Sequence, residues 1–107
     1  MAACSSPAPA PSSAVTASTV IIDVRTAPEY VGGHLQDAIN IDVQSPDFGT
    51  LIAALPIDGD YIIYCATGNR SAAAVTRITD LGSTTLTDAG GITDASAATG
   101  LAIVIDK

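Results

Sequence analysis

Tryptophan is absent from this chain of 107 residues, and only one phenylalanine, one methionine and one histidine occur. With so few aromatic rings, the hydrophobic core has to be built mainly from aliphatic side chains. A structural zinc site is excluded, because two cysteines and one histidine supply too few ligands. Two cysteines are also too few for a disulfide-stabilised scaffold. No apolar run approaches the roughly 18 residues that a membrane-spanning helix needs.

Basic residues are scarce as well. Four basic residues against eleven acidic ones give a formal net charge of −7. Such a chain repels polyanions over long range, so it is not expected to bind nucleic acid. Apolar residues make up 48% and charged residues 14%, which excludes intrinsic disorder of the whole chain. The length allows a single domain, and a monomer is expected.

The first 18 residues differ in composition from the rest: they are rich in alanine, serine and proline and carry no charged side chain. This composition predicts a disordered N-terminal tail over residues 1–18, followed by one domain over residues 19–107. Within the tail, Ala2-Ala3-Cys4 is similar to the end of a bacterial lipoprotein signal, in which the cysteine is lipidated. In that case Cys4 tethers the domain to a membrane outside the cytoplasm. If the match is coincidental, a cytoplasmic location is expected.

The remaining residues alternate between short strand-like runs and helical segments. Strands are predicted at residues 20–24, 38–41, 61–64 and 84–87, and helices at 26–31, 45–55, 71–81 and 93–99. The second helix is expected to begin at Pro46 with Ser45 as its N-cap. Leu51, Ile52 and Leu55 have helical spacing and predict a buried helix face. A turn is predicted at 88–91, and the apolar segment 101–105 has no assigned role. The alternation predicts an α/β fold with a mostly parallel central sheet flanked by helices.

Cys65 carries the strongest functional signal. It follows the buried strand predicted at 61–64 and precedes a loop that enters a helix, so it lies at the sheet edge where α/β folds bind ligands. Backbone N–H groups of the loop can converge there, and the following helix adds the positive end of its dipole. Such surroundings lower the pKa of a thiol and make it a nucleophile at neutral pH. The candidate catalytic residue is therefore Cys65, and the residues expected to bind substrate are Ala66, Thr67, Gly68, Asn69, Arg70 and Ser71.

Two residues of this loop have more specific expected roles. Gly68 can adopt a positive φ without strain, which lets the backbone curl around the sulfur. Arg70, five residues after the cysteine, can neutralise a bound anion or brace the loop by hydrogen bonds. The alternatives for Arg70 are a solvated side chain or an ion pair with an aspartate.

Other candidate residues have purely structural interpretations. An inert buried thiol is the alternative for Cys65, because free cysteines often pack in cores. The composition of the loop and its strand–loop–helix context favour the nucleophile. For Asp23 and Arg25 an ion pair at the strand end is preferred. For His34 a loop residue hydrogen-bonded to the backbone is preferred.

Several short motifs follow one another along the chain. Asp-Val-Arg stands at 23–25, Pro-Glu-Tyr at 28–30, Gly-His-Leu at 33–35 and Ala-Ile-Asn at 38–40. Cys-Ala-Thr-Gly-Asn-Arg-Ser occupies 65–71, and Leu86 precedes Gly-Gly-Ile at 90–92. In order this series resembles the rhodanese pattern of D-x-R, E-[YF], G-H-[IL], A-x-N, the active loop C-x-x-G-x-R-S and a later L-x-G-G. The resemblance covers about residues 20–95.

The resemblance implies a single rhodanese-like domain and sulfurtransferase activity without a cofactor. In this family the loop cysteine, here Cys65, takes a sulfane sulfur from a donor such as thiosulfate, a persulfide or a polysulfide. It holds the sulfur as a persulfide and passes it to a thiophilic small molecule or a protein thiol. One alternative is a non-catalytic rhodanese module for binding or for sulfide or redox sensing. A phosphatase or an arsenate reductase is less favoured, because the related enzymes have one residue more in this loop.

Several positions depart from the family pattern. Glu29 stands where two-domain thiosulfate sulfurtransferases have a basic residue, and Ala66 and Thr67 match positions that tend to be charged there. These differences weaken the case for thiosulfate as the natural donor. Ala95 replaces a common tryptophan, and Asp37 replaces a common glycine. Neither of these two substitutions touches the predicted chemistry.

Overall fold

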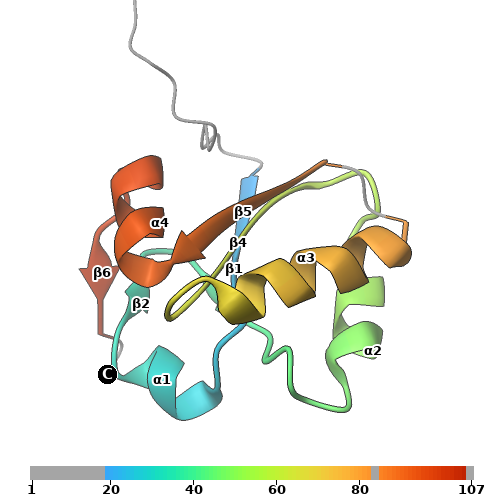
Figure 1. Cartoon of the computed structure of the whole chain (residues 1–107), viewed down its shortest axis with the longest axis horizontal. Helices are drawn as coiled ribbons and strands as arrows, with labels where there is room; N and C mark the ends of the chain where they lie inside the picture. The colour runs from blue at the N-terminus through green and yellow to red at the C-terminus, as the bar shows by residue number, and fades with distance from the viewer. Residues whose placement is uncertain (1–18, 83–84, 106–107) are drawn as a thin grey trace, which may run out of the picture.

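A four-stranded parallel sheet forms the centre of the molecule (Figure 1). The computed structural model describes residues 19–82 and 85–105. The strands lie in the order β3-β1-β4-β5, and every neighbouring pair is parallel. Their bounds are Thr19–Asp23 for β1, Ile39–Asn40 for β3, Asp60–Cys65 for β4 and Thr85–Gly91 for β5.

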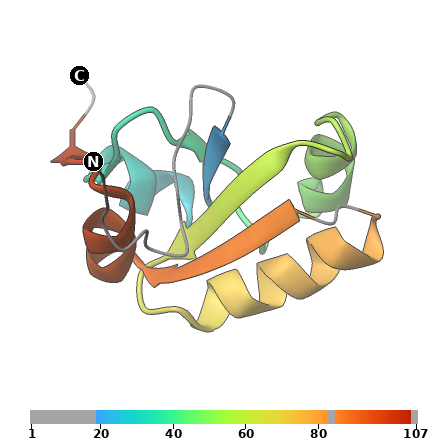
Figure 2. The same cartoon turned by 90° about the horizontal axis from the view of Figure 1, so that it is seen from above.

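Helices cover both faces of this sheet (Figures 1 and 2). They are α1 at Ala27–Val31, α2 at Phe48–Ala53, α3 at Asn69–Asp80 and α4 at Ile92–Thr99. Side chains of α2 and α3 join the hydrophobic cluster on one face, and side chains of α1 and α4 join the cluster on the other. The predicted α/β fold with a mostly parallel, helix-flanked sheet is confirmed.

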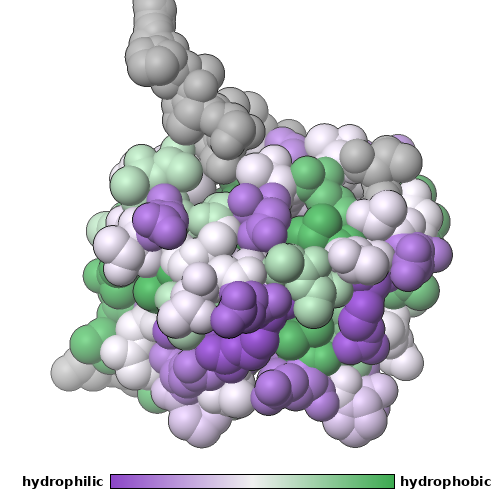
Figure 3. Space-filling model, in the orientation of Figure 1, coloured by the Kyte–Doolittle hydropathy of each residue, from purple (hydrophilic) through white to green (hydrophobic). Residues whose placement is uncertain are grey.

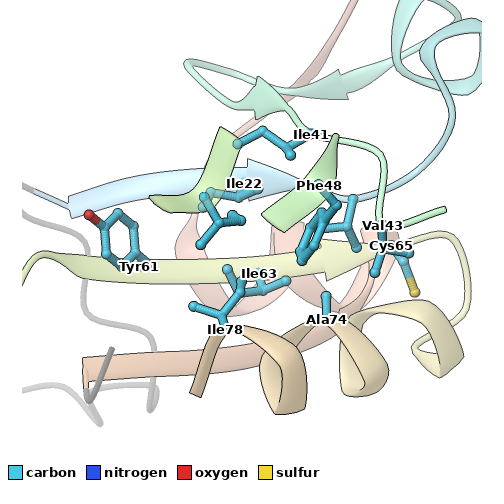
Figure 4. Close-up of a cluster of buried hydrophobic side chains, with 11 residues drawn as sticks. Ile22, Ile41, Val43, Phe48, Tyr61, Ile63, Cys65, Ala74 and Ile78 are labelled. Carbon is cyan, nitrogen blue, oxygen red and sulfur yellow. The ribbon is translucent and has the colours of Figure 1, made fainter. Parts of the chain in front are cut away.

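The two hydrophobic clusters meet at β4, the central buried strand. Ile63 and Cys65 belong to the cluster beneath α2 and α3 (Figure 4), whereas Ile62 and Tyr64 belong to the cluster beneath α1 and α4. Successive side chains of a strand point to opposite faces, so a strand covered on both faces is apolar throughout. This packing fixes the end of β4, and with it the position of Cys65.

A small second sheet lies beside the main one. It pairs β2, His34–Leu35, with β6, Ile103–Val104, in antiparallel orientation. The apolar segment 101–105 thus gains a structural role that its sequence did not specify. A strand of two residues carries no period that could be recognised in a sequence.

The second helix and its apolar stripe differ from the prediction. The helix α2 begins at Phe48 rather than at Pro46, and its N-cap is Asp47 rather than Ser45. The Ser45 hydroxyl instead accepts a hydrogen bond from the Asp47 amide, so this segment is a turn that precedes the helix. The predicted buried stripe is wrong at Leu51, which is 46% exposed, because only one side of this short helix meets the sheet.

The turn predicted at 88–91 is also wrong, because β5 continues through these residues to Gly91. Its pairing with β4 shifts register between Ile63 and Tyr64, and Gly90 takes a φ of +79° at the irregularity. A bulge of this kind uses the same residue types as a turn, which explains the wrong prediction. The start predicted for this strand, residue 84, lies outside the described residues.

Both chain ends reach beyond the part of the chain that the structure describes. The predicted tail over residues 1–18, with Cys4, lies outside the described residues, and so do residues 83–84 and 106–107. Within residues 19–82 and 85–105, no helix is both long enough and apolar enough to cross a bilayer.

Candidate active site

Cys65 is the last residue of β4 and lies at the carboxyl edge of the sheet, as the sequence predicts. Its side chain is fully buried, with 0% of its surface exposed. The sulfur is turned toward the loop that enters the helix carrying Ala74 and Ile78 (Figure 4). The Gly68 amide donates a hydrogen bond to Cys65 Sγ over 2.9 Å. The sulfur is therefore shielded from water but is in contact with the loop backbone.

Several hydrogen-bond donors converge on this sulfur. Burial raises the pKa of the Cys65 thiol, because it disfavours the anion. The Ser71 hydroxyl and the amides of Ser71, Gly68 and Thr67 act in the opposite direction, and the resulting pKa lies below its ordinary value. An inert thiol in an apolar pocket would have a raised pKa. The loop instead forms a nest of N–H groups that stabilises negative charge on sulfur.

The shape of the loop depends on glycines at two places. Gly68 has a φ of +105°, the conformation expected for it from the sequence. Thr67 forms a bridge to Gly91 at the end of β5, and a Cβ placed on Gly91 would lie 2.7 Å from the Ala66 carbonyl oxygen. The loop backbone therefore packs directly on β5, in space that only a residue without a side chain leaves open.

Arg70 joins the loop to α1. Its Nη1 donates to Glu29 Oε1 over 2.7 Å and its Nη2 donates to Glu29 Oε2 over 2.9 Å. These bonds, with a further one from the Thr26 amide, lower the pKa of Glu29 to about 2. Of the roles considered for Arg70, the structure shows a brace, and the ion-pair partner is a glutamate rather than the aspartate considered from the sequence. In this pairing the Arg70 guanidinium is occupied by hydrogen bonds within the protein.

The residues predicted to bind substrate do not all approach the sulfur. The described contacts to Cys65 Sγ come from Thr67, Gly68 and Ser71. Ala66 is half-buried, and Asn69 is exposed as the first residue of α3. A hydrophilic surface covers the region where α1 and the start of α3 lie (Figure 3).

Asp88 is a neighbour of the site that the sequence did not single out. Its Oδ1 accepts a hydrogen bond from the Ser71 hydroxyl over 2.7 Å and another from the Gly90 amide over 2.9 Å. An aspartate two residues before a glycine is typical of a local side-chain-to-backbone turn. That signal explains the bond to Gly90, but the bond to Ser71 depends on the pairing of β5 with β4.

The ion pair predicted for Asp23 and Arg25 is confirmed, and the prediction for His34 is confirmed in part. Arg25 Nη2 lies 2.6 Å from Asp23 Oδ2, and the pair is buried. His34 Nδ1 lies 2.8 Å from the Tyr30 carbonyl oxygen, so the predicted hydrogen bond to backbone is present. The predicted loop position is wrong, because His34 belongs to the strand β2, which pairs with β6. Both contacts organise the segment between β1 and β2, and neither includes the Cys65 sulfur.

All three arginines of the chain make ion pairs or hydrogen bonds within the protein. Arg25 pairs with Asp23, and Arg70 pairs with Glu29. Arg77 donates to a backbone carbonyl at 2.8 Å, and its guanidinium lies 4.6 Å from the centre of the Phe48 ring. An anion at the loop would therefore be held mainly by backbone N–H groups.

No group of three or more histidine, cysteine, aspartate and glutamate side chains comes together as a possible metal site within residues 19–82 and 85–105. Cys65 is the only cysteine of this part of the chain and is not in a disulfide. The chemistry that this arrangement offers is that of a stabilised sulfur anion.

Comparison with known proteins identifies the family. The family model described as "Rhodanese-like domain" matches residues 12–98. The chain belongs to the rhodanese-like family. This membership accounts for the motifs at 23–40 and for the cysteine loop at 65–71.

Individual relatives agree with this assignment. The chain is 34% identical over 74 residues to thiosulfate sulfurtransferase PspE of Escherichia coli strain K12, a match that spans 68% of this chain and 70% of PspE. The solved structure described as a rhodanese with anions from E. coli is 27% identical, with a TM-score of 0.67 over 82% of this chain and 99% of the other. A rhodanese-related protein from Thermoplasma volcanium is 30% identical, with a TM-score of 0.68 over 83% of this chain and 86% of the other.

Proposed function

We propose that this rhodanese-like domain is a sulfurtransferase that works through a persulfide on Cys65. The Cys65 thiolate attacks the outer sulfur of a sulfane donor, the sulfur–sulfur bond of the donor breaks, and the remainder of the donor leaves with the bonding electron pair. A thiophilic acceptor then attacks the terminal sulfur of the persulfide and regenerates the thiolate. The two half-reactions give ping-pong kinetics.

One observation carries this proposal: the Gly68 amide lies 2.9 Å from Cys65 Sγ, and further donors converge on the same atom. The sulfur is anionic before attack, and the terminal sulfur of the persulfide is anionic after it. Fixed amide donors stabilise such charge without reorganisation, in the way that an oxyanion hole stabilises oxygen.

The donor is proposed to be an organic persulfide in preference to thiosulfate. Thiosulfate is a dianion, the chain has a net charge of −7, and the three arginines are committed to internal contacts. The thiosulfate activity in the name of PspE belongs to that protein. A small thiol or a protein thiol is the proposed acceptor, and the domain is proposed to act as a monomer without a cofactor.

A second candidate function is a rhodanese module that binds a partner or senses sulfide without turnover. The complete burial of Cys65 favours this candidate, because a donor reaches the sulfur only if the loop opens. A phosphatase or an arsenate reductase is disfavoured by the short Cys65–Arg70 loop. Inertness toward aryl phosphates and arsenate is the expected result.

Intact-mass spectrometry after incubation with a donor tests these candidates. The protein is treated separately with thiosulfate and with cysteine persulfide, in a Cys4→Ser background so that only one thiol reacts. A gain in mass of one sulfur atom, absent in Cys65→Ser and reversed by cyanide, is expected, with the persulfide the faster donor. No gain with any donor by a folded protein would reject the sulfurtransferase and leave the binding module.

We also propose that Cys4, which lies outside the described residues, carries a lipid anchor that holds the domain at a membrane outside the cytoplasm. Its resemblance to a lipoprotein cysteine supports this proposal. Recovery of the protein in the membrane fraction of its native cells, lost in Cys4→Ser, is the expected result. Recovery of both forms in the soluble fraction would reject it.

A further inference from the structure

The Ser71 hydroxyl lies near more hydrogen-bond acceptors than its single proton can bind at one time. Its Oγ lies 2.7 Å from Asp88 Oδ1 and 3.0 Å from the Gly68 carbonyl oxygen. Gly68 links this hydroxyl to the sulfur, because its carbonyl accepts from Ser71 and its amide donates to Cys65 Sγ over 2.9 Å. The Ser71 hydroxyl is also among the groups that lower the pKa of the Cys65 thiol. A serine hydroxyl carries one proton and can therefore donate one full hydrogen bond at a time. The acceptor that receives this proton therefore determines how strongly the hydroxyl can stabilise negative charge on the Cys65 sulfur.

The carboxylate is the strongest of these acceptors. A hydrogen bond to an ionised oxygen is shorter and stronger than a bond to a neutral carbonyl, and the distance to Asp88 is the shorter of the two to oxygen. A neutral thiol is a weak acceptor by comparison. The proton therefore rests on the Asp88 side while Cys65 is protonated.

Asp88 is held in place although its side chain is exposed. The same Oδ1 that accepts from Ser71 also accepts from the Gly90 amide over 2.9 Å. Its backbone is paired with Ile63 of β4, two residues before Cys65. Ser71 is fully buried, so water does not compete for its hydroxyl. The carboxylate is thus aligned by β5 on one side and by the hydroxyl on the other.

We propose that Asp88 is a positioning residue that fixes the single proton of Ser71 and thereby sets how strongly this hydroxyl stabilises charge on the Cys65 sulfur. With Asp88 in place, the backbone amides carry most of that stabilisation. A sulfur anion competes with the carboxylate for the hydroxyl proton, and loss of the carboxylate shifts the proton to the sulfur. The other charged side chains around the loop are Arg70 and, acting through it, Glu29 and Asp42.

This inference rests on the proposed function, since it takes Cys65 as the reacting group. Its test reads the ionisation of the thiol and requires no sulfur transfer. If the titration shows no effect of Asp88, the sulfurtransferase proposal still stands. If the protein transfers no sulfur, the titration can still be measured.

The test follows thiolate formation by ultraviolet absorbance against pH, because the buried sulfur is not open to bulky reagents. All variants carry Cys4→Ser. Asp88→Asn keeps an oxygen for the Gly90 amide but removes the charge, and it is expected to lower the Cys65 midpoint by about 0.5–1 pH unit, or about 3- to 10-fold in the ionisation constant. The matched control is Asp94→Asn, which removes an exposed carboxylate near Gly90. It is expected to move the midpoint little.

A double-mutant cycle separates the positioning effect from simple loss of charge. In a Ser71→Ala background, Asp88→Asn is expected to shift the midpoint much less than it does when the hydroxyl is present. An equal shift in both backgrounds, or no shift in either, would overturn the proposal.

Asp88→Glu gives the same separation if Ser71→Ala does not fold. It keeps the negative charge but moves the carboxylate by one methylene, away from the position in which it accepts from the Ser71 hydroxyl. A midpoint lowered in Asp88→Glu as in Asp88→Asn supports the proposal, and a midpoint equal to that of the parent protein overturns it.

Discussion

The guanidinium of Arg70 and the carboxylate of Glu29 form two parallel hydrogen bonds, of 2.7 and 2.9 Å, across 41 positions of the sequence. Glu29 lies in the first turn of α1 and Arg70 in the first turn of α3, so the pair ties the helix after β1 to the helix that begins in the cysteine loop. Through this contact a residue far from the sulfur influences the geometry of the loop.

The Glu29 carboxylate makes the free energy of unfolding depend on pH. Its pKa is lowered from 4.5 to about 2 in the folded protein. The pair therefore stabilises the fold above about pH 4.5, and this stabilisation is lost as the pH falls toward about 2. In Glu29→Gln that part of the acid sensitivity is expected to disappear. Because both side chains are partly exposed, the difference at neutral pH is about 0.5–1 kcal/mol.

Urea unfolding at a series of pH values measures this effect. Asp80→Asn at the exposed end of α3 serves as the control and is expected to keep the acid sensitivity of the parent protein. Parallel loss of stability with falling pH in the parent and in Glu29→Gln would contradict the prediction.

Gly91→Ala is expected to damage the loop more than the fold. The new Cβ would lie 2.7 Å from the Ala66 carbonyl oxygen, so the loop backbone has to move. Displacement of a reacting group by about 1 Å lowers rates by about 100-fold, and a loss of that size is expected in persulfide formation. Gly49→Ala is the matched control, because its Cβ meets nothing within 4 Å in the helix α2.

Stopped reactions analysed by intact mass give the rate of persulfide formation for both variants, and urea unfolding gives their stabilities. Gly49→Ala is expected to keep the rate and gain up to about 1 kcal/mol in unfolding free energy. A Gly91→Ala protein with an unchanged rate would show that contact with β5 does not shape the loop.

Tyr64→Phe is expected to weaken the fold without changing the thiol. The Leu35 amide donates to the Tyr64 hydroxyl over 2.9 Å, and both residues are fully buried. Removal of the hydroxyl leaves the amide unpaired at a cost of about 1–3 kcal/mol. Tyr61→Phe is the control: its hydroxyl donates to the Pro56 carbonyl in a part-buried position, so a smaller loss is expected. Urea unfolding measures both, and an unchanged stability in Tyr64→Phe would count against this prediction.

Local signals made the cysteine loop predictable from the sequence. A strand of tyrosine and isoleucine that ends at Cys65, a glycine at position 68 and the apolar spacing of α3 are all contained within about twenty consecutive residues. The pKa-lowering amides follow from that local geometry. The ion pair of Asp23 with Arg25 was predictable for the same reason, since the two residues are neighbours on one strand end.

Features that arise from pairing between distant segments were not predictable. The extension of β5 to Gly91 depends on a register shift against β4, and the role of Asp88 depends on that extension. The strand β6 exists only because Ile103 and Val104 meet β2. A pattern of residue types records whether a segment is apolar, but it does not record which other segment completes its hydrogen bonds.

Arg70→Lys distinguishes the two functions that an arginine can have at this loop. Lysine keeps the positive charge but lacks the planar fork that makes two parallel bonds with a carboxylate. If Arg70 acts mainly as a brace, Arg70→Lys loses most of the transfer rate, by about 10- to 100-fold, and approaches Arg70→Ala. If it mainly neutralises an anionic donor, Arg70→Lys keeps the KM for thiosulfate while Arg70→Ala raises it.

The bidentate geometry leads us to expect the first result. Steady-state kinetics with thiosulfate and with cysteine persulfide separate kcat from KM for each variant. Arg77→Lys is the control on the same helix, because Arg77 contacts the Val43 carbonyl and the Phe48 ring rather than the loop. A brace affects both donors equally, since it acts through the position of the Cys65 sulfur. A KM that rises for thiosulfate alone would contradict the brace and assign Arg70 to donor recognition.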